Sequence, residues 1–248
     1  MRTYFIGIFM LGLLQSQHAA AWDGARVVTT STTSSSPPSA RVASAPSPAA
    51  RGARAVLAGE QASRDARHIA DWVMDSGDNR GLPFVIVDKT EARIFVFDPG
   101  GWISGAAPAL LGLARGDDTV PGIGDRELSS IRPEERTTPA GRFVAQLGMS
   151  FRGEDVVWVD YDSGVSLHRV VTSNPRERRL ERLATPTPAD NRISYGCINV
   201  PAAFYNSVIA PAFAGTTGIV YVLPETRPVR RVFGSYDVPE QRYAVQAP

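Results

Sequence analysis

The chain of 248 residues carries 26 Lys and Arg against 25 Asp and Glu, which gives a formal net charge of +1. It lacks the basic stripe with interleaved aromatic residues that single-strand nucleic-acid binders use, so we exclude nucleic acid as a partner. A single cysteine and three histidines are too few for a zinc site of the usual kind, and no internal disulfide can form.

The N-terminal residues have the pattern of a secretory signal peptide. Arg2 supplies a short positive region, residues 4–14 form an apolar run too short to span a bilayer, and residues 19–21 are small and suited to cleavage. We expect residues 1–21 to be removed and the mature protein to lie in the periplasm, unattached to the membrane. An uncleaved N-terminal anchor is the alternative. No later segment is apolar for long enough to cross a membrane.

Residues 22–52 are rich in Ser, Thr, Pro and Ala. Such a stretch buries too little apolar surface to offset the entropy lost on ordering, so we interpret it as a disordered tether. The following part, residues 53–81, is expected to hold a helix over 54–74. Its apolar residues recur at helical spacing, namely Ala62, Ala66, Ile69 and Val73. His68 lies off this stripe, which favours a solvated or Asp-paired histidine.

Short β-branched and aromatic runs separated by turn residues occupy most of the remaining chain. Those at 84–88 and 93–97 predict a hairpin. Further strands are expected at 102–112, 142–145, 156–159, 164–168 and 218–223, and a helix at 201–213. We therefore predict one mostly-β domain over 82–224 with a few short helices, followed by an Arg- and Pro-rich tail at 225–248.

The only cysteine, Cys197, stands in the segment Ser-Tyr-Gly-Cys-Ile-Asn at 194–199. A lone cysteine is most often a small buried hydrophobic residue. In an oxidising compartment, however, an exposed thiol without a function is a liability. His168 ends a predicted strand upstream and supplies an imidazole that could lower the pKa of the thiol from roughly 8.5. We interpret the two residues as a nucleophile and its base.

Three features together resemble the L,D-transpeptidase catalytic domain of the ErfK/YkuD type. They are the opening hairpin, the Thr-Pro-Ala-Gly-Arg-Phe segment at 138–143, and a histidine followed by the Ser-x-Gly-Cys-hydrophobic-Asn segment. The resemblance covers most of residues 82–224 and implies a mostly-β sandwich or barrel with a few short helices. Thr138 is expected to have a structural role in the turn that it begins.

The resemblance implies an acyltransferase of bacterial cell-wall biogenesis that needs no metal or organic cofactor. Cys197 would form an acyl-enzyme with a tetrapeptide stem of peptidoglycan and release D-alanine, with His168 as general base and acid. An amine on another stem would then accept the acyl group, which makes a 3→3 crosslink. Backbone N–H groups of Tyr195, Gly196 and Cys197 would form the oxyanion hole, while Ser194 and Asn199 would support the loop.

The chain departs from the family pattern in three places. Tyr195 stands where many members have a second histidine and cannot act as a base at neutral pH. Arg169 stands where Gly or Ser is usual, although its backbone carbonyl remains available to orient His168. The stretch between His168 and Cys197 is also longer than usual, by an insertion near 174–191.

The insertion is rich in arginine, and two interpretations of it remain open. It is either a lid whose guanidinium groups meet stem-peptide carboxylates, or a solvated segment paired internally through Glu177 and Glu181. Arg176 and Arg192 are candidate substrate contacts under the first interpretation.

Two other functions fit the same residues. A thiol carboxypeptidase or endopeptidase would hydrolyse the same stems with water as the acceptor. A non-catalytic wall-binding domain could keep the fold while losing the chemistry. The sequence indicates neither the acceptor nor the oligomeric state.

Overall fold

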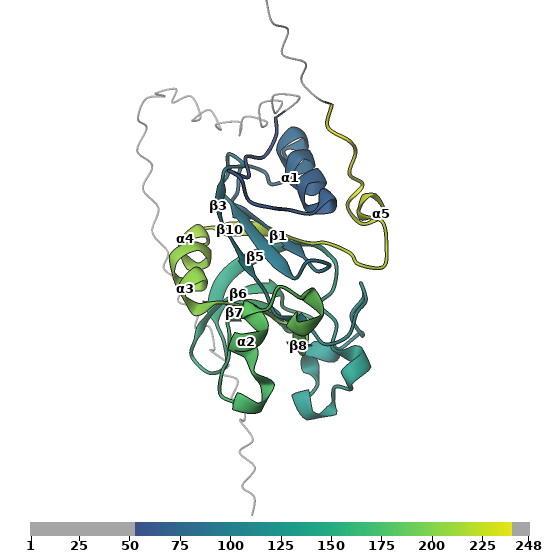
Figure 1. The fold of residues 1–248 in the computed structure, drawn as a ribbon, viewed down its shortest axis with the longest axis vertical. Coiled ribbons are helices and arrows are strands. Elements are labelled where there is room, and N and C mark those ends of the chain that lie inside the picture. The colour runs from purple at the N-terminus through teal and green to yellow at the C-terminus, as the bar shows by residue number, and fades with distance from the viewer. Residues whose placement is uncertain (1–52, 240–248) are drawn as a thin grey trace, which may run out of the picture. The chain divides into compact units, whose positions relative to one another are not determined.

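The computed structural model describes residues 53–239. The predicted signal peptide and tether, together with residues 240–248 of the tail, lie outside the described residues. The described backbone is built on an eight-stranded mixed sheet with a smaller two-stranded sheet and several short helices (Figure 1). The expected mostly-β fold is confirmed.

The large sheet has the spatial order β3-β2-β1-β10-β5-β6-β7-β9. In this order the strands span Ile103–Pro108, Arg93–Phe97, Phe84–Asp88, Thr217–Val222, Gly141–Met149, Asp155–Asp160, Val165–Arg169 and Ile198–Val200. Neighbours are antiparallel except for two parallel pairs, β1 with β10 and β7 with β9. The small sheet pairs β4 (Leu111–Gly112) with β8 (Arg192–Ser194) in parallel. The hairpin predicted at 84–88 and 93–97 has those bounds in β1 and β2.

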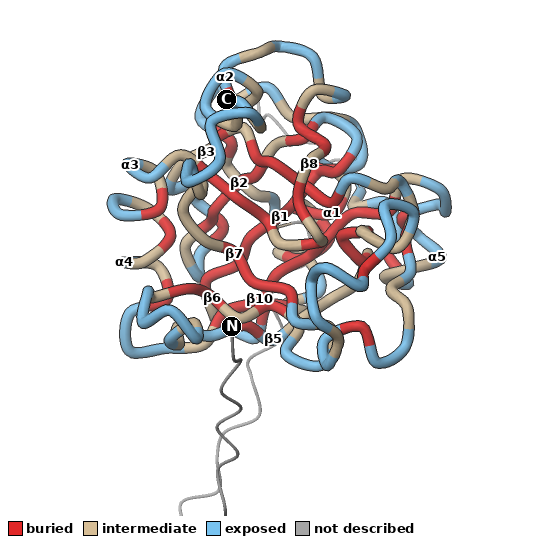
Figure 2. The backbone as a smooth tube through the Cα atoms, turned by 90° about the horizontal axis from the view of Figure 1, so that it is seen from below, coloured by how far each residue is buried: buried red, intermediate tan, exposed pale blue. Residues whose placement is uncertain are grey.

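The central strands are apolar on both faces because each face is covered. Successive side chains of a strand point to opposite faces. Accordingly Val85 and Val87 belong to one buried cluster, while Phe84 and Ile86 belong to the other. The rings of Phe84 and Phe97 stack across the hairpin with centroids 4.6 Å apart. Figure 2 shows the buried backbone following the strands, with exposed segments in the connecting loops.

Helix α1 (Arg64–Ser76) covers the face that carries Phe84 and Ile86, through buried side chains that include Ile69 and Val73. The helix was expected to begin at residue 54, which is ten residues before the observed start at Arg64. Ser63 caps its N-terminus by accepting the N–H of Ala66, and the preceding residues turn at Gly59, which has a φ of 88°. They form a bridge from Val56 to Trp102 instead of extending the helix.

The helical segment predicted at 201–213 covers the other face. It runs through α3 (Ala202–Phe204), a π-helical stretch η6 (Tyr205–Ile209) and α4 (Ala210–Ala212). Tyr205, Ile209 and Phe213 are buried in the cluster that contains Val85 and Val87. The remaining short helices are η1 (Ile123–Asp125), η2 (Leu128–Ser130), η3 (Pro133–Glu135), η4 (Pro175–Glu177), α2 (Arg179–Ala184), η5 (Pro188–Asn191) and α5 (Val229–Phe233).

The tail up to residue 239 is attached to the domain. Glu225 lies with Arg192 in a buried ion pair whose closest N–O distance is 2.6 Å. Further along, the ring of Phe233 in α5 makes an edge contact with Tyr221, with centroids 5.9 Å apart. These contacts bring the C-terminal segment onto the same core as β10.

Candidate active site

The parallel pairing of β7 with β9 brings the predicted nucleophile and base together. His168 near the end of β7 is in register with Asn199, and Leu167 is in register with Ile198. Cys197 immediately precedes β9, so the thiol and the imidazole come from adjacent strand ends. The thiol is partly exposed. Strand β9 is only three residues long and was not predicted, although it creates this juxtaposition.

The loop that carries Cys197 is held by hydrogen bonds from its own residues and from Thr138. Ser194 Oγ donates to the Cys197 carbonyl over 2.6 Å and accepts the Gly196 N–H over 3.1 Å. Thr138 Oγ1 donates to the Gly196 carbonyl over 2.8 Å. Gly196 has a φ of 131°, and a Cβ there would lie 2.9 Å from the Thr137 carbonyl oxygen, so only glycine fits. Both hydroxyls thus bond to the loop, and the supporting roles expected for Ser194 and Thr138 stay predictions.

This geometry also corrects the expected oxyanion hole. The Gly196 N–H is directed at Ser194 Oγ and is therefore engaged within the loop. Of the three expected donors, the N–H groups of Tyr195 and Cys197 remain as candidates to face a developing oxyanion.

His168 is oriented by the residue that follows it. Its Nδ1 lies 2.7 Å from the Arg169 carbonyl oxygen. Because a carbonyl oxygen only accepts, Nδ1 carries a proton, and Nε2 is the nitrogen available for exchange with the thiol. The Arg169 side chain contributes separately, since its guanidinium pairs with Asp155 over 2.8 Å and lies 4.2 Å from the centroid of the Tyr205 ring.

The electrostatics of the pair favour a thiolate beside an imidazolium. Burial raises the pKa of Cys197, but the hydrogen bond and charge of His168, aided by hydrogen bonds from Ser166, outweigh it and lower the pKa below its ordinary value. Burial likewise lowers the pKa of His168, and the hydrogen bond and charge of Cys197 outweigh it and raise that pKa. Ser166 Oγ and the Gly164 carbonyl oxygen each lie 3.6 Å from Cys197 Sγ.

Two site residues were missed by the sequence analysis. Ser166 could have been found, because strand alternation places it on the same face as His168, two residues away. Arg136 could not, because it lies on a distant loop. Its guanidinium carbon stands 3.9 Å from the centroid of the Tyr195 ring, a cation–π contact beside the thiol loop. Tyr195 thus serves as a platform for an arginine side chain.

Asn199 is buried behind the pair and contacts both of its members. Its Nδ2 lies 3.3 Å from the Cys197 carbonyl oxygen and 3.4 Å from His168 Nε2. Its Oδ1 accepts from Arg179 Nη1 over 2.7 Å. The support role expected for Asn199 therefore extends to the base as well as the loop.

The two arginines expected to contact substrate lie in different environments. Arg192 is 7% exposed and interior, where it pairs with Glu225 and donates to the Lys89 carbonyl over 2.7 Å. This placement corrects the expectation, because these internal partners occupy its guanidinium. Arg176 is exposed on η4. His68 lies away from the thiol, with Nε2 2.9 Å from Ser235 Oγ and Nδ1 3.4 Å from Asp237, which agrees with an Asp-paired histidine.

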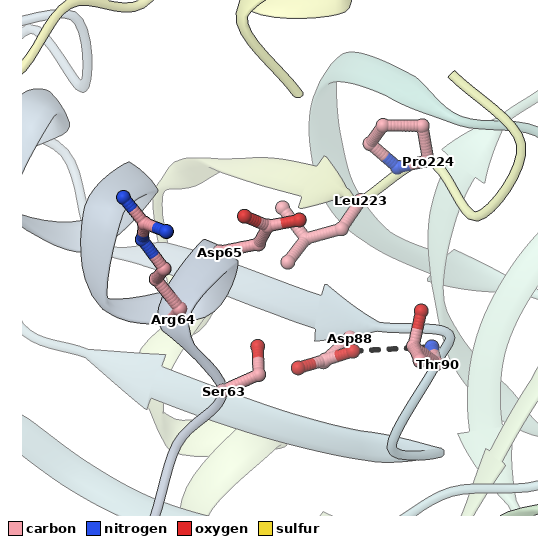
Figure 3. A pocket seen from close by; sticks show the side chains of 7 residues that line it. All are labelled: Ser63, Arg64, Asp65, Asp88, Thr90, Leu223 and Pro224. Carbon is pink, nitrogen blue, oxygen red and sulfur yellow. Dashed lines mark hydrogen bonds between the residues drawn. The ribbon is translucent and has the colours of Figure 1, made fainter. Parts of the chain in front are cut away.

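A separate pocket of about 210 Å³ lies between the start of α1 and the end of β1 (Figure 3). Ser63, Asp65, Asp88 and Thr90 are among its lining residues. Asp88 Oδ1 accepts the Thr90 N–H and so closes the β1–β2 turn.

Within residues 53–239, no group of three or more His, Cys, Asp and Glu side chains is arranged to hold a metal ion. The same residues include no helix that is long and apolar enough to cross a membrane.

Neither the protein-family models nor the curated proteins gave a match to this chain. Among solved structures, LdtMt1 in complex with imipenem is 18% identical with a TM-score of 0.32, over 57% of this chain and 58% of that chain. An L,D-transpeptidase from Xylanimonas cellulosilytica is 16% identical with a TM-score of 0.36, over 57% and 60%.

The helical cell shape determining protein Pgp2 from Campylobacter jejuni is 15% identical with a TM-score of 0.39, over 59% of this chain and 49% of that chain. This chain thus spans between 49% and 60% of the three structures that it matches. The family that the sequence resembles recurs among these structures. At such identities and TM-scores, the likeness assigns no activity to this chain.

Proposed function

We propose that this chain is a peptidoglycan L,D-transpeptidase that works through a Cys197 acyl-enzyme. The observation that carries the proposal is the pairing of Cys197 with a His168 ring whose Nδ1 is held by the Arg169 carbonyl. This is the arrangement that an activated thiol nucleophile needs, namely a base within reach and a third group that orients it.

In the proposed reaction Cys197 Sγ attacks the carbonyl that follows the L-centre of the third residue in a tetrapeptide stem. The oxyanion that forms is stabilised by the N–H groups of Tyr195 and Cys197, and each such donor contributes about 3 kcal/mol to transition-state stabilisation. The His168 imidazolium then gives its Nε2 proton to the departing amine, and D-alanine leaves as the thioester forms.

The second half of the reaction reverses these proton movements. Neutral His168 takes a proton from the incoming amine of another stem, which attacks the thioester carbonyl. The new amide forms a crosslink between stems, and the thiolate is restored beside the imidazolium. His168 therefore acts as acid in the first half and as base in the second, while Cys197 forms and releases the thioester.

We also propose that the protein works in the periplasm after export. A signal peptide at residues 1–21 would lead there, and stem peptides are found there. A protein with one cysteine cannot lose its thiol to an internal disulfide in that oxidising compartment.

Intact-mass spectrometry of the exported protein mixed with tetrapeptide-stem muropeptides tests the proposal, with Cys197→Ala as the matched variant. We expect a mass adduct on the wild type alone, release of D-alanine, and crosslinked product. The variant is expected to fold normally and to lose turnover completely, because no other thiol exists in the chain.

The products distinguish the alternatives. An adduct that resolves only into shortened stems would indicate a hydrolase with water as acceptor. Folded protein with a reduced thiol that gives neither adduct nor D-alanine would contradict the proposal and favour a wall-binding domain. Full activity in Cys197→Ala would exclude a thiol mechanism altogether.

A further inference from the structure

The insertion between β7 and β8 is held mainly by its own contacts. Arg182 donates from Nε to the Glu177 carbonyl over 2.9 Å and from Nη1 to the Asp190 carbonyl over 2.7 Å. Arg178 pairs with Glu181 on the exposed side of α2. These guanidinium groups stabilise the insertion itself, as expected for an internally paired segment.

Arg179 differs from its neighbours because it reaches out of the insertion. Its side chain is 11% exposed, and its Nε forms an ion pair with the Glu177 carboxylate. At Nη1 it donates over 2.7 Å to Oδ1 of Asn199, which is 1% exposed and lies in β9 beside the thiol. A largely covered guanidinium with a carboxylate on one side and an amide oxygen on the other is held in one orientation.

The contact with Arg179 decides which way the Asn199 amide faces. Arginine has only donors, so Asn199 must present its oxygen to Arg179 and its Nδ2 group to the opposite side. That side holds the Cys197 carbonyl at 3.3 Å and His168 Nε2 at 3.4 Å. A rotated amide would instead place its oxygen against Nε2, where it would accept an Nε2–H proton and compete with the thiolate for the imidazolium.

We propose that Arg179 is a positioning residue for the His168–Cys197 pair, which it acts on by fixing the orientation of the Asn199 amide. With Nδ2 toward the ring, Asn199 offers no acceptor to the imidazolium, and the Nε2 proton is left to the sulfur and to the substrate amine. This inference deepens the proposed function and rests on the same two residues being the reactive pair.

The charge of Arg179 acts in the same direction as its hydrogen bond. The charged groups that face His168 are the Cys197 thiolate, from the loop before β9, and Arg179, from α2 with Glu177 behind it. The thiolate favours the imidazolium and the guanidinium disfavours it. Removing Arg179 therefore frees the amide to rotate and also removes a positive charge, and both changes favour a protonated His168.

The test is the pH titration of the His168 ring by NMR in the folded, reduced protein, with the signal assigned by its loss in His168→Gln. For Arg179→Met we expect the pKa of His168 to rise by about half a unit or more. Arg178→Met is the matched control, since it removes an exposed arginine from the same insertion, and it should titrate like the wild type.

A double-mutant comparison separates the amide from the charge. If Arg179 acts through Asn199, the shift caused by Arg179→Met should fall by at least half in an Asn199→Ala background. A shift that is undiminished there, or absent in the single variant, would overturn the proposal.

Asn199→Asp gives a second test if Arg179→Met does not fold. Its carboxylate can accept from Arg179 while it turns a second, negatively charged oxygen toward Nε2, so the pKa of His168 should rise; an unchanged pKa would contradict the contact between residue 199 and Nε2 on which the proposal depends. None of these titrations requires turnover. A chain that fails to transfer acyl groups could still confirm or refute the role of Arg179.

Discussion

At the scale of single residues, the candidate pair of Cys197 and His168 depends on backbone groups as much as on its two side chains. The Arg169 carbonyl selects the tautomer of His168, and the hydroxyls of Ser194 and Thr138 hold the loop that presents Cys197. The unusual Arg169 is therefore compatible with the chemistry, because the group that orients the base belongs to the main chain. Its guanidinium is directed away from the ring, toward Asp155.

The mutual pKa shifts of the pair predict how thiol reactivity depends on pH. In the wild type, alkylation of Cys197 by iodoacetamide should continue below pH 8.5, the approximate pKa of a free thiol, because the hydrogen bond and charge of His168 outweigh burial and lower the pKa of Cys197. In His168→Ala the main effect that opposes burial of the thiol is lost and only the hydrogen bonds from Ser166 remain, so the rising limb of the rate profile should move upward, toward about pH 8.5.

The alkylation rate measured across pH checks this expectation. His68→Ala is the control, because His68 lies beside Ser235 and Asp237, away from the thiol. A rate profile for His168→Ala that overlays the wild type would show that the imidazole does not activate Cys197.

At the scale of secondary-structure elements, two helical segments make the sheet a rigid support for the site. The run from α3 to α4 covers one face and α1 covers the other, so the strands that end at the thiol are packed from both sides. The site is therefore built on strand ends and a tethered loop, and the insertion adds a third support through Arg179.

Substitution in α1 should reduce stability while leaving the site chemistry intact. Ile69 is fully buried against the sheet. Ile69→Ala is expected to lower the free energy of unfolding by about 2–5 kcal/mol, through lost burial and the cavity left behind. Chemical denaturation measures this change, with the exposed Arg67→Ala as control.

Thiol alkylation of the still-folded Ile69→Ala protein should match the wild type. A marked fall in reactivity without unfolding would show that α1 is coupled to the site. Equal stability of the two α1 variants would instead contradict the burial assigned to Ile69.

At the scale of the whole molecule, a buried ionic cluster joins the tail to the middle of the chain. Lys89 is the only lysine and is fully buried, with Nζ 3.0 Å from Asp117 and from the Thr138 carbonyl. Asp117 also accepts the N–H groups of Glu225 and Thr226. Thr138 also donates from Oγ1 to the Gly196 carbonyl, so the cluster connects the C-terminal segment to the thiol loop.

The titration of Asp117 should make the free energy of unfolding depend on pH in the acidic range. Burial raises the pKa of Asp117, but hydrogen bonds from Thr226, the Glu225 N–H and Lys89 outweigh it and hold the pKa well below its ordinary value of 3.8. A lowered folded-state pKa contributes stability that is fully present above about pH 4 and is lost as the pH falls toward the folded-state value.

Asp117→Asn is therefore expected to cost about 3 kcal/mol near neutral pH, since it leaves Lys89 with a weaker partner in the interior. Its stability should also fall less steeply below pH 4 than that of the wild type. Denaturation across pH measures both effects, and the exposed neighbour in Asp118→Asn provides the control. Equal acid sensitivity in the wild type and Asp117→Asn would contradict this account.

Local patterns in the sequence predicted the β1–β2 hairpin, most of the strands that follow it, and Cys197 and His168 as candidate site residues. These features depend on alternation, turn residues and short motifs, which act between neighbours along the chain. The start of α1 was predicted too early because the apolar spacing extends upstream of Ser63. The helix nevertheless begins only after Ser63, which caps its N-terminus, and the chain before it turns at Gly59.

Only the tertiary structure decided the partners of the arginines and of the Gly196 N–H. Arg179 contacts Asn199, Arg136 contacts Tyr195 and Arg192 contacts Glu225, each across a long stretch of chain. An arginine in a polar segment carries the same local signal whether its guanidinium meets solvent, substrate or a buried carboxylate. Which of these it meets depends on how distant elements pack, and the short strand β9 beside β7 sets that packing at the thiol.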